Sequence, residues 1–294
     1  MFGHRSDGNL VKKIDPIIAL TPYLMPMRCD AQVFLSYKVD YEVLARYIVA
    51  QGLEGHKLTF MEVIIAAFVR AASELPEINR FIANKRMYAR NELTVSFVAL
   101  KDNSRNEIEE NTVKCHFDPG DNIYDVSDRV KNIIKDARTE AMDTSALKVA
   151  KVLSRPFLAN PVVAIVRLMD RYGIMPRFLL DASPFHTSLF ITNMASIGMS
   201  AVNHHIYNFG TTTMFWSIGA VERTVQLDSS GNAVRKRMLP IGVTADERVA
   251  PGAVYAKMVA RMFNLLNDPK QLEEKPERIN YDEGHEYHVQ KKKS

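Results

Sequence analysis

Strand-like and helix-like segments alternate along most of this chain of 294 residues. Apolar and polar residues partly alternate over 30–39, as in a half-buried strand, and 41–51 then has the apolar spacing of a helix that ends at Gly52. Near the other end, 252–266 places its apolar side chains on one helical face. No break in composition interrupts 30–268. This order predicts one α/β domain, with a mixed β-sheet flanked by helices.

Capping and turn residues predict the other elements. Thr59 and Glu62 fit a capping box, which starts a helix that ends before Pro76. The residues Asp228-Ser-Ser-Gly-Asn232 are a strong turn signal and should join two strands. Strands are also predicted over 93–100, 112–117, 187–194, 212–226 and 233–246, and helices over 122–141, over 145–158 and around Pro161.

The composition excludes several classes of protein. Hydrophobic residues make up 47% and charged residues 24%, which excludes collagen-like and wholly disordered chains. Cys29 and Cys115 cannot form a disulfide framework, and the absence of a C-x-x-C pair argues against a zinc or redox motif. We therefore expect reduced thiols in a cytoplasmic protein. A net charge of +4 without a localised patch does not predict nucleic-acid binding.

The two ends of the chain differ from its middle. Residues 1–28 are predicted to form an irregular arm, because their apolar run, 14–27, is interrupted by Asp15 and three prolines. The same interruptions argue against a signal peptide, and no run of about 18 apolar residues predicts a membrane span. Residues 269–294 are polar, with six basic and six acidic side chains after position 269, and predict an extended or mobile tail.

The strand, turn and helix over 238–256 resemble the closing segment of the chloramphenicol acetyltransferase superfamily. The resemblance is greatest to the catalytic domain of the dihydrolipoamide acyltransferases of 2-oxoacid dehydrogenase complexes, which ends with an Asp-His-Arg-x-x-Asp-Gly turn. Three upstream stretches also resemble that family in order: Leu58–Asn79 its first long helix with a Leu-Pro-x-Asn ending, Phe190–Gly198 its Phe-Thr-x-Ser-Asn-Leu-Gly strand, and Phe215–Val221 its Ala-Ile-Leu-Ala-Val-Gly strand. The resemblance assigns 29–268 to an acyltransferase-like domain.

This resemblance implies a trimer with active sites between subunits. Coenzyme A and an acyl acceptor would enter a channel from opposite ends. The turn histidine of the family is the general base for a thiol or hydroxyl proton, and a Ser or Thr hydroxyl stabilises the oxyanion. The turn aspartate orients the site and pairs with arginine. The chain has no lipoyl domain, so no covalent lipoyl group is expected, and we expect no metal.

Carried onto this chain, the resemblance leaves the site incomplete. Thr192 stands at the oxyanion position, but Glu247 replaces the histidine and Pro251 replaces the second aspartate. The turn keeps three residues of the motif: Asp246, Arg248 and Gly252. An unperturbed glutamate is a worse acceptor of a thiol proton than histidine by roughly 3 kcal/mol, and only a dry pocket would recover this. The alternative is that Glu247 pairs with Arg248 or another cation and holds the turn.

Other histidines offer a substitute base. His204 and His205 lie in Asn203–Gly210, which resembles the His-His-x-x-x-Asp-Gly signature of condensation-type acyltransferases with Phe209 in place of the aspartate. The segment precedes the hairpin strands, so its position argues against equivalence, and the pair could equally belong to a loop or interface contact. His186 is a further candidate, against the simpler interpretation of a histidine at a strand end. His285-Glu-Tyr-His288 does not have the spacing of a zinc motif.

Two functions follow from these residues. The first is a catalytically degenerate acyltransferase-like protein, kept for assembly as a homotrimer or a multiple of three, or as a partner of acyltransferase or dehydrogenase-complex subunits. The alternative is an active enzyme that uses coenzyme A or an acyl-CoA as substrate. It would use Thr192 at the oxyanion and Glu247, His204 or His205 as an unusual base. Neither function requires nucleic acid or a membrane.

Overall fold

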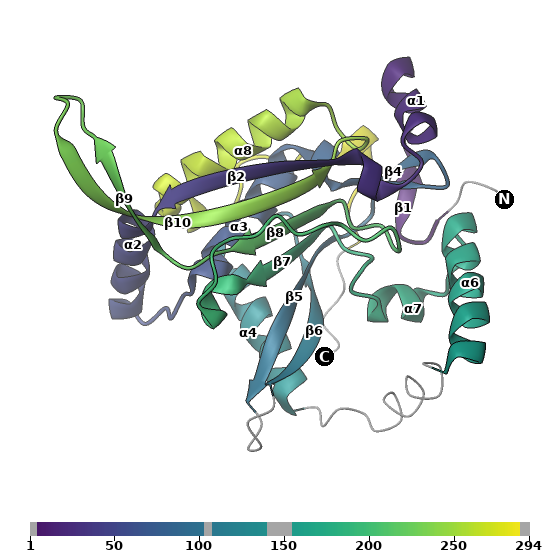
Figure 1. Ribbon diagram of the computed structural model, residues 1–294, viewed down its shortest axis with the longest axis horizontal. Coiled ribbons are helices and arrows are strands. Elements are labelled where there is room, and N and C mark those ends of the chain that lie inside the picture. The colour runs from purple at the N-terminus through teal and green to yellow at the C-terminus, as the bar shows by residue number, and fades with distance from the viewer. Residues whose placement is uncertain (1–4, 103–107, 140–154, 289–294) are drawn as a thin grey trace.

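A seven-stranded mixed sheet forms the centre of the computed structural model, which describes residues 5–102, 108–139 and 155–288 (Figure 1). The strand order is β2-β10-β8-β7-β5-β6, and β9 pairs with β10. Strand β7 runs parallel to β5 and β8, and the other pairs are antiparallel. The predicted α/β fold with a mixed sheet is therefore confirmed. The strands are β2 (Gln32–Asp40), β5 (Leu93–Asp102), β6 (Ile108–Phe117), β7 (Leu189–Asn193), β8 (Met214–Ile218), β9 (Glu222–Leu227) and β10 (Ala233–Asp246).

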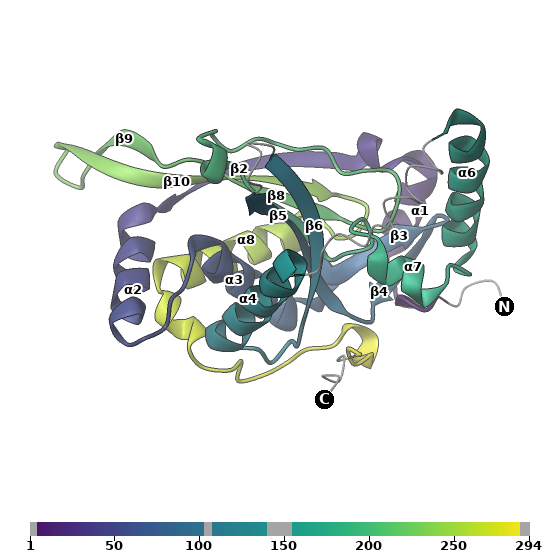
Figure 2. The same cartoon turned by 90° about the horizontal axis from the view of Figure 1, so that it is seen from below.

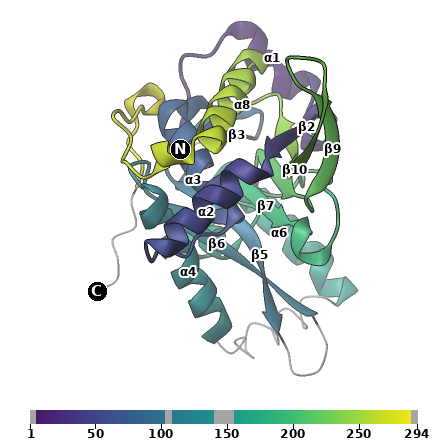
Figure 3. The same cartoon turned by 90° about the vertical axis from the view of Figure 1, so that its left-hand side faces the viewer.

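Four helices cover one face of this sheet (Figure 2). Helix α3 is buried along most of its length, and the predicted capping box begins it: the Thr59 amide donates to Glu62 Oε2 at 2.6 Å. Phe68 of α3 packs edge-on against Trp216 of β8, with ring centroids 5.8 Å apart. Helices α2 and α8 pack against β2 and β10 at one end of this layer (Figure 3). The four helices are α2 (Tyr41–Leu53), α3 (Phe60–Glu74), α4 (Ile123–Thr139) and α8 (Gly252–Asn267).

The N-terminal arm is not irregular, which corrects the sequence-based prediction. It contains strand β1 (Gly8–Leu10), which joins a second small sheet beside β4 (Arg86–Arg90) and β3 (Arg80–Ala83), and helix α1 (Pro16–Leu24). The side chain of Asp15 accepts a hydrogen bond from the Ile17 amide, and Pro16 occupies the first turn. An Asp-Pro pair can start a helix as well as interrupt an apolar run, and here it starts α1.

The C-terminal tail packs on the domain as far as residue 288, so the prediction of an extended or mobile tail is wrong there. Arg80 of β3 forms an ion pair with Asp282 at 2.6 Å, and the amide of Asn280 donates to the Ser73 carbonyl at 2.8 Å. Two of its acidic side chains have partners in the rest of the chain: Asp282 pairs with Arg80, and Glu283 accepts from the amides of Lys12 and Lys13. Composition alone does not reveal such partners.

Three further elements differ from their predicted bounds. The predicted strand 212–226 is two strands, β8 and β9, separated around Gly219, where a Cβ would lie 2.0 Å from the backbone nitrogen of Ala201. Helix α6 (Pro156–Tyr172) begins at Pro156, and Pro161 lies inside it. Most of the helix predicted over 145–158 lies outside the described residues. A short helix, α7 (Arg177–Ala182), was not predicted.

The segment 199–213 crosses the sheet face opposite the four helices. Ser217 of β8 binds Val202 of this segment through its hydroxyl, which donates to the Val202 carbonyl at 2.5 Å and accepts from its amide at 2.9 Å. Gly242 of β10 permits this approach, because a Cβ there would lie 2.4 Å from the Val202 carbonyl oxygen. Phe190 and Phe215 also belong to this face and form a small apolar cluster with Ile206.

Candidate functional site

The turn between β10 and α8 is held by a buried carboxylate. Arg248 donates to both oxygens of Asp246, from Nε at 2.8 Å and from Nη2 at 2.7 Å. A second guanidinium, that of Arg28, approaches the same carboxylate at 3.3 Å. Tyr255 of α8 donates from its hydroxyl to the Asp246 carbonyl at 2.9 Å. The turn is therefore a rigid unit in which Arg248 is committed to Asp246.

Burial sets the electrostatics of this cluster. Desolvation lowers the pKa of Arg28, and the charge of Arg248 lowers it further, while Asp246 opposes both effects. Burial raises the pKa of the Tyr255 hydroxyl, and the Asp246 charge adds to that rise. One carboxylate thus serves two buried guanidinium groups. Sequence reasoning missed Arg28, which lies in the arm and has no periodic pattern around it.

Glu247 does not form the ion pair with Arg248 that the sequence suggested, because Asp246 takes that role. Its side chain is exposed, and among the described residues no ion pair reaches its carboxylate. The Glu247 amide donates to the Ala31 carbonyl at 2.9 Å. Pro251 is the residue before α8, and Gly252 is its first residue. Residues 5–102, 108–139 and 155–288 therefore form no dry pocket around Glu247.

A cavity of about 420 Å³ surrounds Thr192 on the opposite face of the sheet from the four helices. Thr192 is half-buried on β7, and its hydroxyl lies 3.9 Å from the Met194 sulfur, a weak acceptor. His204 lines the same cavity and stacks on Phe215, with ring centroids 4.0 Å apart. Phe215 stacks in turn on Phe190 at 4.9 Å. The aromatic stack places an imidazole at the edge of the cavity that contains the threonine hydroxyl.

The hydrogen bond of His204 determines its tautomer. Its Nδ1 lies 2.7 Å from the carbonyl oxygen of His205. Because a carbonyl oxygen only accepts, Nδ1 carries the proton and a neutral ring keeps the lone pair of Nε2. A neutral imidazole that is protonated at Nδ1 can accept a proton at Nε2. His205 is exposed and contributes its backbone carbonyl, and its side chain is not among those that line the cavity.

The two halves of the predicted site lie apart within one chain. Thr192 is in register with Ser217 of β8, which is in register with Gly242 of β10. Asp246 lies four residues farther along β10, about 14 Å along the strand and two strands, or about 10 Å, across the sheet. Thr192 and His204 are thus brought together, and the turn that carries Glu247 is not brought to them.

His186 lies in a separate buried cluster. Its Nδ1 is 2.7 Å from the Ser183 hydroxyl, and its Nε2 is 3.3 Å from the carboxylate of Asp170. Burial alone would raise the pKa of Asp170, but His186 and Arg5 outweigh burial and lower that pKa to about 2. His186 does not line the cavity around Thr192. The structure therefore does not support His186 as a general base for the cavity around Thr192.

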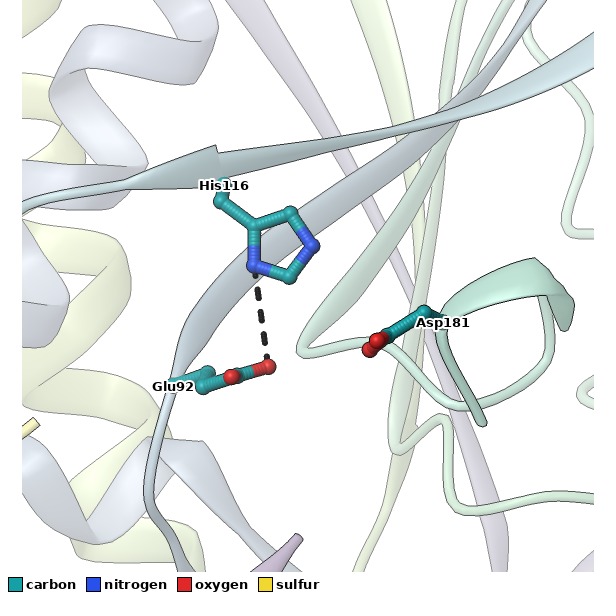
Figure 4. A group of neighbouring side chains, drawn as sticks. All are labelled: Glu92, His116 and Asp181. Carbon is teal, nitrogen blue, oxygen red and sulfur yellow. Dashed lines mark ion pairs between the residues drawn. The ribbon is translucent and has the colours of Figure 1, made fainter. Parts of the chain in front are cut away.

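Glu92, His116 and Asp181 have the residue types of a metal site, and one potential ligand atom of each lies within 4.8 Å of the others (Figure 4). The His116 ring faces the Glu92 carboxylate, with Nδ1 3.6 Å from it. Arg177 already bridges the two carboxylates: it forms an ion pair with Glu92 and lies 3.0 Å from Asp181. The guanidinium thus takes the place of a cation, and the cluster fits an ion-pair network better than a metal centre.

Comparisons with known proteins show the fold. The sequence matches no protein-family model and no curated protein. The structure of a dihydrolipoamide acetyltransferase from Azotobacter vinelandii aligns with this chain at a TM-score of 0.56 and 14% sequence identity. The alignment covers 90% of this chain and 94% of that one. A probable dihydrolipoamide acetyltransferase from Listeria monocytogenes has a TM-score of 0.53 and 13% identity, over 87% and 93%. Chloramphenicol acetyltransferase has a TM-score of 0.52 and 13% identity, over 88% and 99%.

In the part of the chain that the structure describes, every helix is too short or too polar to cross a bilayer. The structural similarity extends over most of each neighbour, so it concerns the whole fold and not a shared motif. The chain therefore has the fold that chloramphenicol acetyltransferase shares with the catalytic cores of the dihydrolipoamide acetyltransferases.

Proposed function

We propose that the chain is a coenzyme-A-dependent acyltransferase in which His204 replaces the base that the turn has lost. The observation that carries this proposal is the cavity shared by the Thr192 hydroxyl and the His204 imidazole. The hydrogen bond from Nδ1 to the His205 carbonyl leaves Nε2 available as an acceptor. The acyltransferase-like fold supports the same reaction class.

The reaction would need two proton transfers at Nε2 of His204. The thiol or hydroxyl of the acceptor loses its proton to Nε2 while its sulfur or oxygen attacks the thioester carbonyl of acyl-CoA. The oxyanion that forms accepts a hydrogen bond from Thr192 Oγ1. When the tetrahedral intermediate collapses, the bond to the coenzyme A sulfur breaks, and the imidazolium returns its proton to that thiolate.

A trimer, or a multiple of three, belongs to this proposal. The turn lies too far from Thr192 within one chain to reach this cavity, so any contribution of the turn to the site would come from a neighbouring copy. Light scattering should then give three copies or a multiple of three. A monomer that retains full turnover would rule out a shared site.

Acyl transfer is best tested by release of the coenzyme A thiol from acetyl-CoA, with dihydrolipoamide and chloramphenicol as trial acceptors. His204→Gln should lower kcat by about 10²–10⁴-fold, the range for removal of a general base. His205→Gln is the matched control, because its backbone carbonyl remains, and should leave kcat nearly unchanged. Thr192→Val should lower kcat by about 10²-fold or more. Turnover that vanishes in Glu247→Gln but survives in His204→Gln would assign the base to the turn instead.

A second candidate function is assembly or binding without catalysis. In that case the protein keeps the acyltransferase-like fold but does not transfer acyl groups. Its support is that Glu247 is exposed and that Pro251 stands in place of the second aspartate. Wild-type protein that forms a trimer but releases no thiol with either acceptor, and that forms complexes with acyltransferase or dehydrogenase-complex subunits, would favour this function. Turnover that depends on His204 would exclude it.

A further inference from the structure

A cleft of about 510 Å³ lies at the end of the molecule where α1 and α6 stand (Figure 1). Five segments line it: the end of α1 with the connection after it, the turn between β3 and β4, helix α6, residues 208–210, and the turn between β10 and α8. Asp170 is the one acidic residue among the described residues that line this cleft. The cationic residues that line it are Arg28, Lys85, Arg167, Arg171 and Arg248. We refer to it as the basic cleft.

The buried floor of the basic cleft carries excess positive charge. Arg28 and Arg248 share one carboxylate, that of Asp246, and both side chains are almost wholly buried. Arg28 also donates from Nη1 to the carbonyl oxygens of Tyr207 at 2.7 Å and Gly210 at 3.1 Å. Two guanidinium groups against one carboxylate leave a fixed positive field at this floor.

The acidic residue of the cleft, Asp170, shares its cationic partner Arg5 with a second carboxylate. Arg5 donates from Nη2 to the Asp170 carboxylate at 2.7 Å, and His186 lies 3.3 Å from the same oxygen. A second carboxylate, Asp7, completes the ion pair of Arg5 at 2.7 Å. Asp170 therefore offsets part of the positive charge of the cleft, but the five cations that line it outnumber the two carboxylates of Asp170 and Asp246.

The rim of the basic cleft adds three exposed cations. Arg167 and Arg171 are four residues apart on α6, so they project from the same helical face, where like charges repel. Asn84 and Lys85 form the β3–β4 turn with left-handed backbone, at φ of 47° and 61°. Asn84 accepts a hydrogen bond from Nε of Arg171 at 3.0 Å, which links the turn to the helix. Repulsion among these cations would be relieved by a bound anion.

We infer that the basic cleft binds a phosphorylated ligand through pyrophosphate or phosphomonoester groups. Guanidinium groups bind phosphate oxygens with paired hydrogen bonds, and a concave site with one sign of charge concentrates anions. Coenzyme A is one source of such groups and a free phosphorylated metabolite is another. The inference does not require acyl transfer, so it stands apart from the proposed function.

Calorimetric titration of the full-length protein with inorganic pyrophosphate, coenzyme A and pantetheine tests this inference at low ionic strength. Pyrophosphate and coenzyme A should bind, with affinity that falls as salt is added, and pantetheine, which lacks phosphate, should not. Tighter binding of coenzyme A than of pyrophosphate would assign the cleft to that substrate. Equal or tighter binding of pyrophosphate would assign it to another phosphorylated ligand.

Variants of α6 make the test specific. The double variant Arg167→Gln/Arg171→Gln should weaken binding about 100-fold, since each charge-assisted contact accounts for about tenfold. The double variant Arg167→Lys/Arg171→Lys keeps both positive charges but lacks the planar guanidinium groups that donate paired hydrogen bonds. It should give a loss of affinity between those of the wild type and the Gln variant. Arg155→Gln removes the same charge about 18 Å away at the start of this helix and should change binding less than twofold.

These variants alter exposed side chains, and circular dichroism will confirm that they are folded. Absence of pyrophosphate and coenzyme A binding would overturn the inference, and so would an equal loss in the Arg155 variant. Because pyrophosphate binding is measured without catalysis, a protein that binds it but transfers no acyl group would refute the proposed function alone.

Discussion

Substituting Asp246 with asparagine should strongly destabilise this protein, because the residue is the counter-charge of two buried cations. The Asp246 side chain is 0% exposed, and those of Arg28 and Arg248 are 4% and 3% exposed. Water cannot screen these groups. Asp246→Asn keeps the size of the side chain and removes only its charge and one acceptor oxygen.

The contacts of the carboxylate give the magnitude. Arg248 donates to it at 2.8 and 2.7 Å, and Arg28 at 3.3 Å. An asparagine oxygen can still accept one of these bonds well, so about two are lost. At about 1.5–3 kcal/mol for each bond to a charged group, the loss is about 3–6 kcal/mol. This agrees with the roughly 3–5 kcal/mol that follows removal of one partner from a buried ion pair.

The assay is urea unfolding followed by circular dichroism at a fixed protein concentration, because assembly contributes to apparent stability. Glu42→Gln is the matched control: it neutralises a carboxylate in the exposed ion pair with Arg237 and should leave the midpoint unchanged. If Asp246→Asn fails to fold, adding Arg28→Met should recover folded protein, because it removes one uncompensated charge. A loss below about 1 kcal/mol in the single variant would refute the assignment.

Two further predictions concern buried titratable groups. Burial, assisted by the charge of Arg90, lowers the pKa of Lys114 to about 8, from 10.5. Between pH 8 and pH 10.5 the unfolded chain binds more protons than the folded protein, so the free energy of unfolding should rise with pH by about 3 kcal/mol in total. Urea unfolding midpoints measured across this pH range should show the rise in the wild type and not in Lys114→Met. An identical rise in the variant would contradict the assignment. Burial also raises the pKa of Cys115 to about 12, whereas Cys29 is exposed, so Ellman's reagent should label Cys29 quickly and Cys115 only after unfolding. Rapid labelling of both thiols in native protein would show that Cys115 is accessible.

Features governed by neighbours in sequence were predictable. The capping box of Thr59 and Glu62 has its expected hydrogen bonds because both partners lie within one helical turn. The turn at Asp228–Asn232 joins β9 and β10 as expected, because its hydrogen bonds also stay within five residues. The start of α1 depends on Asp15 in the same local way, so the Asp15-Pro16 pair is a sequence signal for this helix.

Partners distant in sequence were not predictable from pattern. The tail packs because Asp282 meets Arg80, about 200 positions earlier, and no periodicity reports such a pair. The expected pairing of Glu247 with Arg248 was wrong because the carboxylate of Asp246 is buried together with Arg28 and Arg248, whereas the side chain of Glu247 is exposed. Desolvation selects which charges pair, and desolvation depends on the whole fold.

By itself the sequence determined most strands of the central sheet, the four helices on its face and the capping box of Thr59 and Glu62, because these rest on side-chain periodicity and local hydrogen bonds. It also carried the resemblance of the closing turn to an acyltransferase. Only the tertiary structure decided that His204 shares a cavity with Thr192 and that the turn lies away from both. That juxtaposition depends on a loop packed across the sheet, where Gly242 leaves room for the Val202 backbone. Packing of this kind joins residues that no local rule connects.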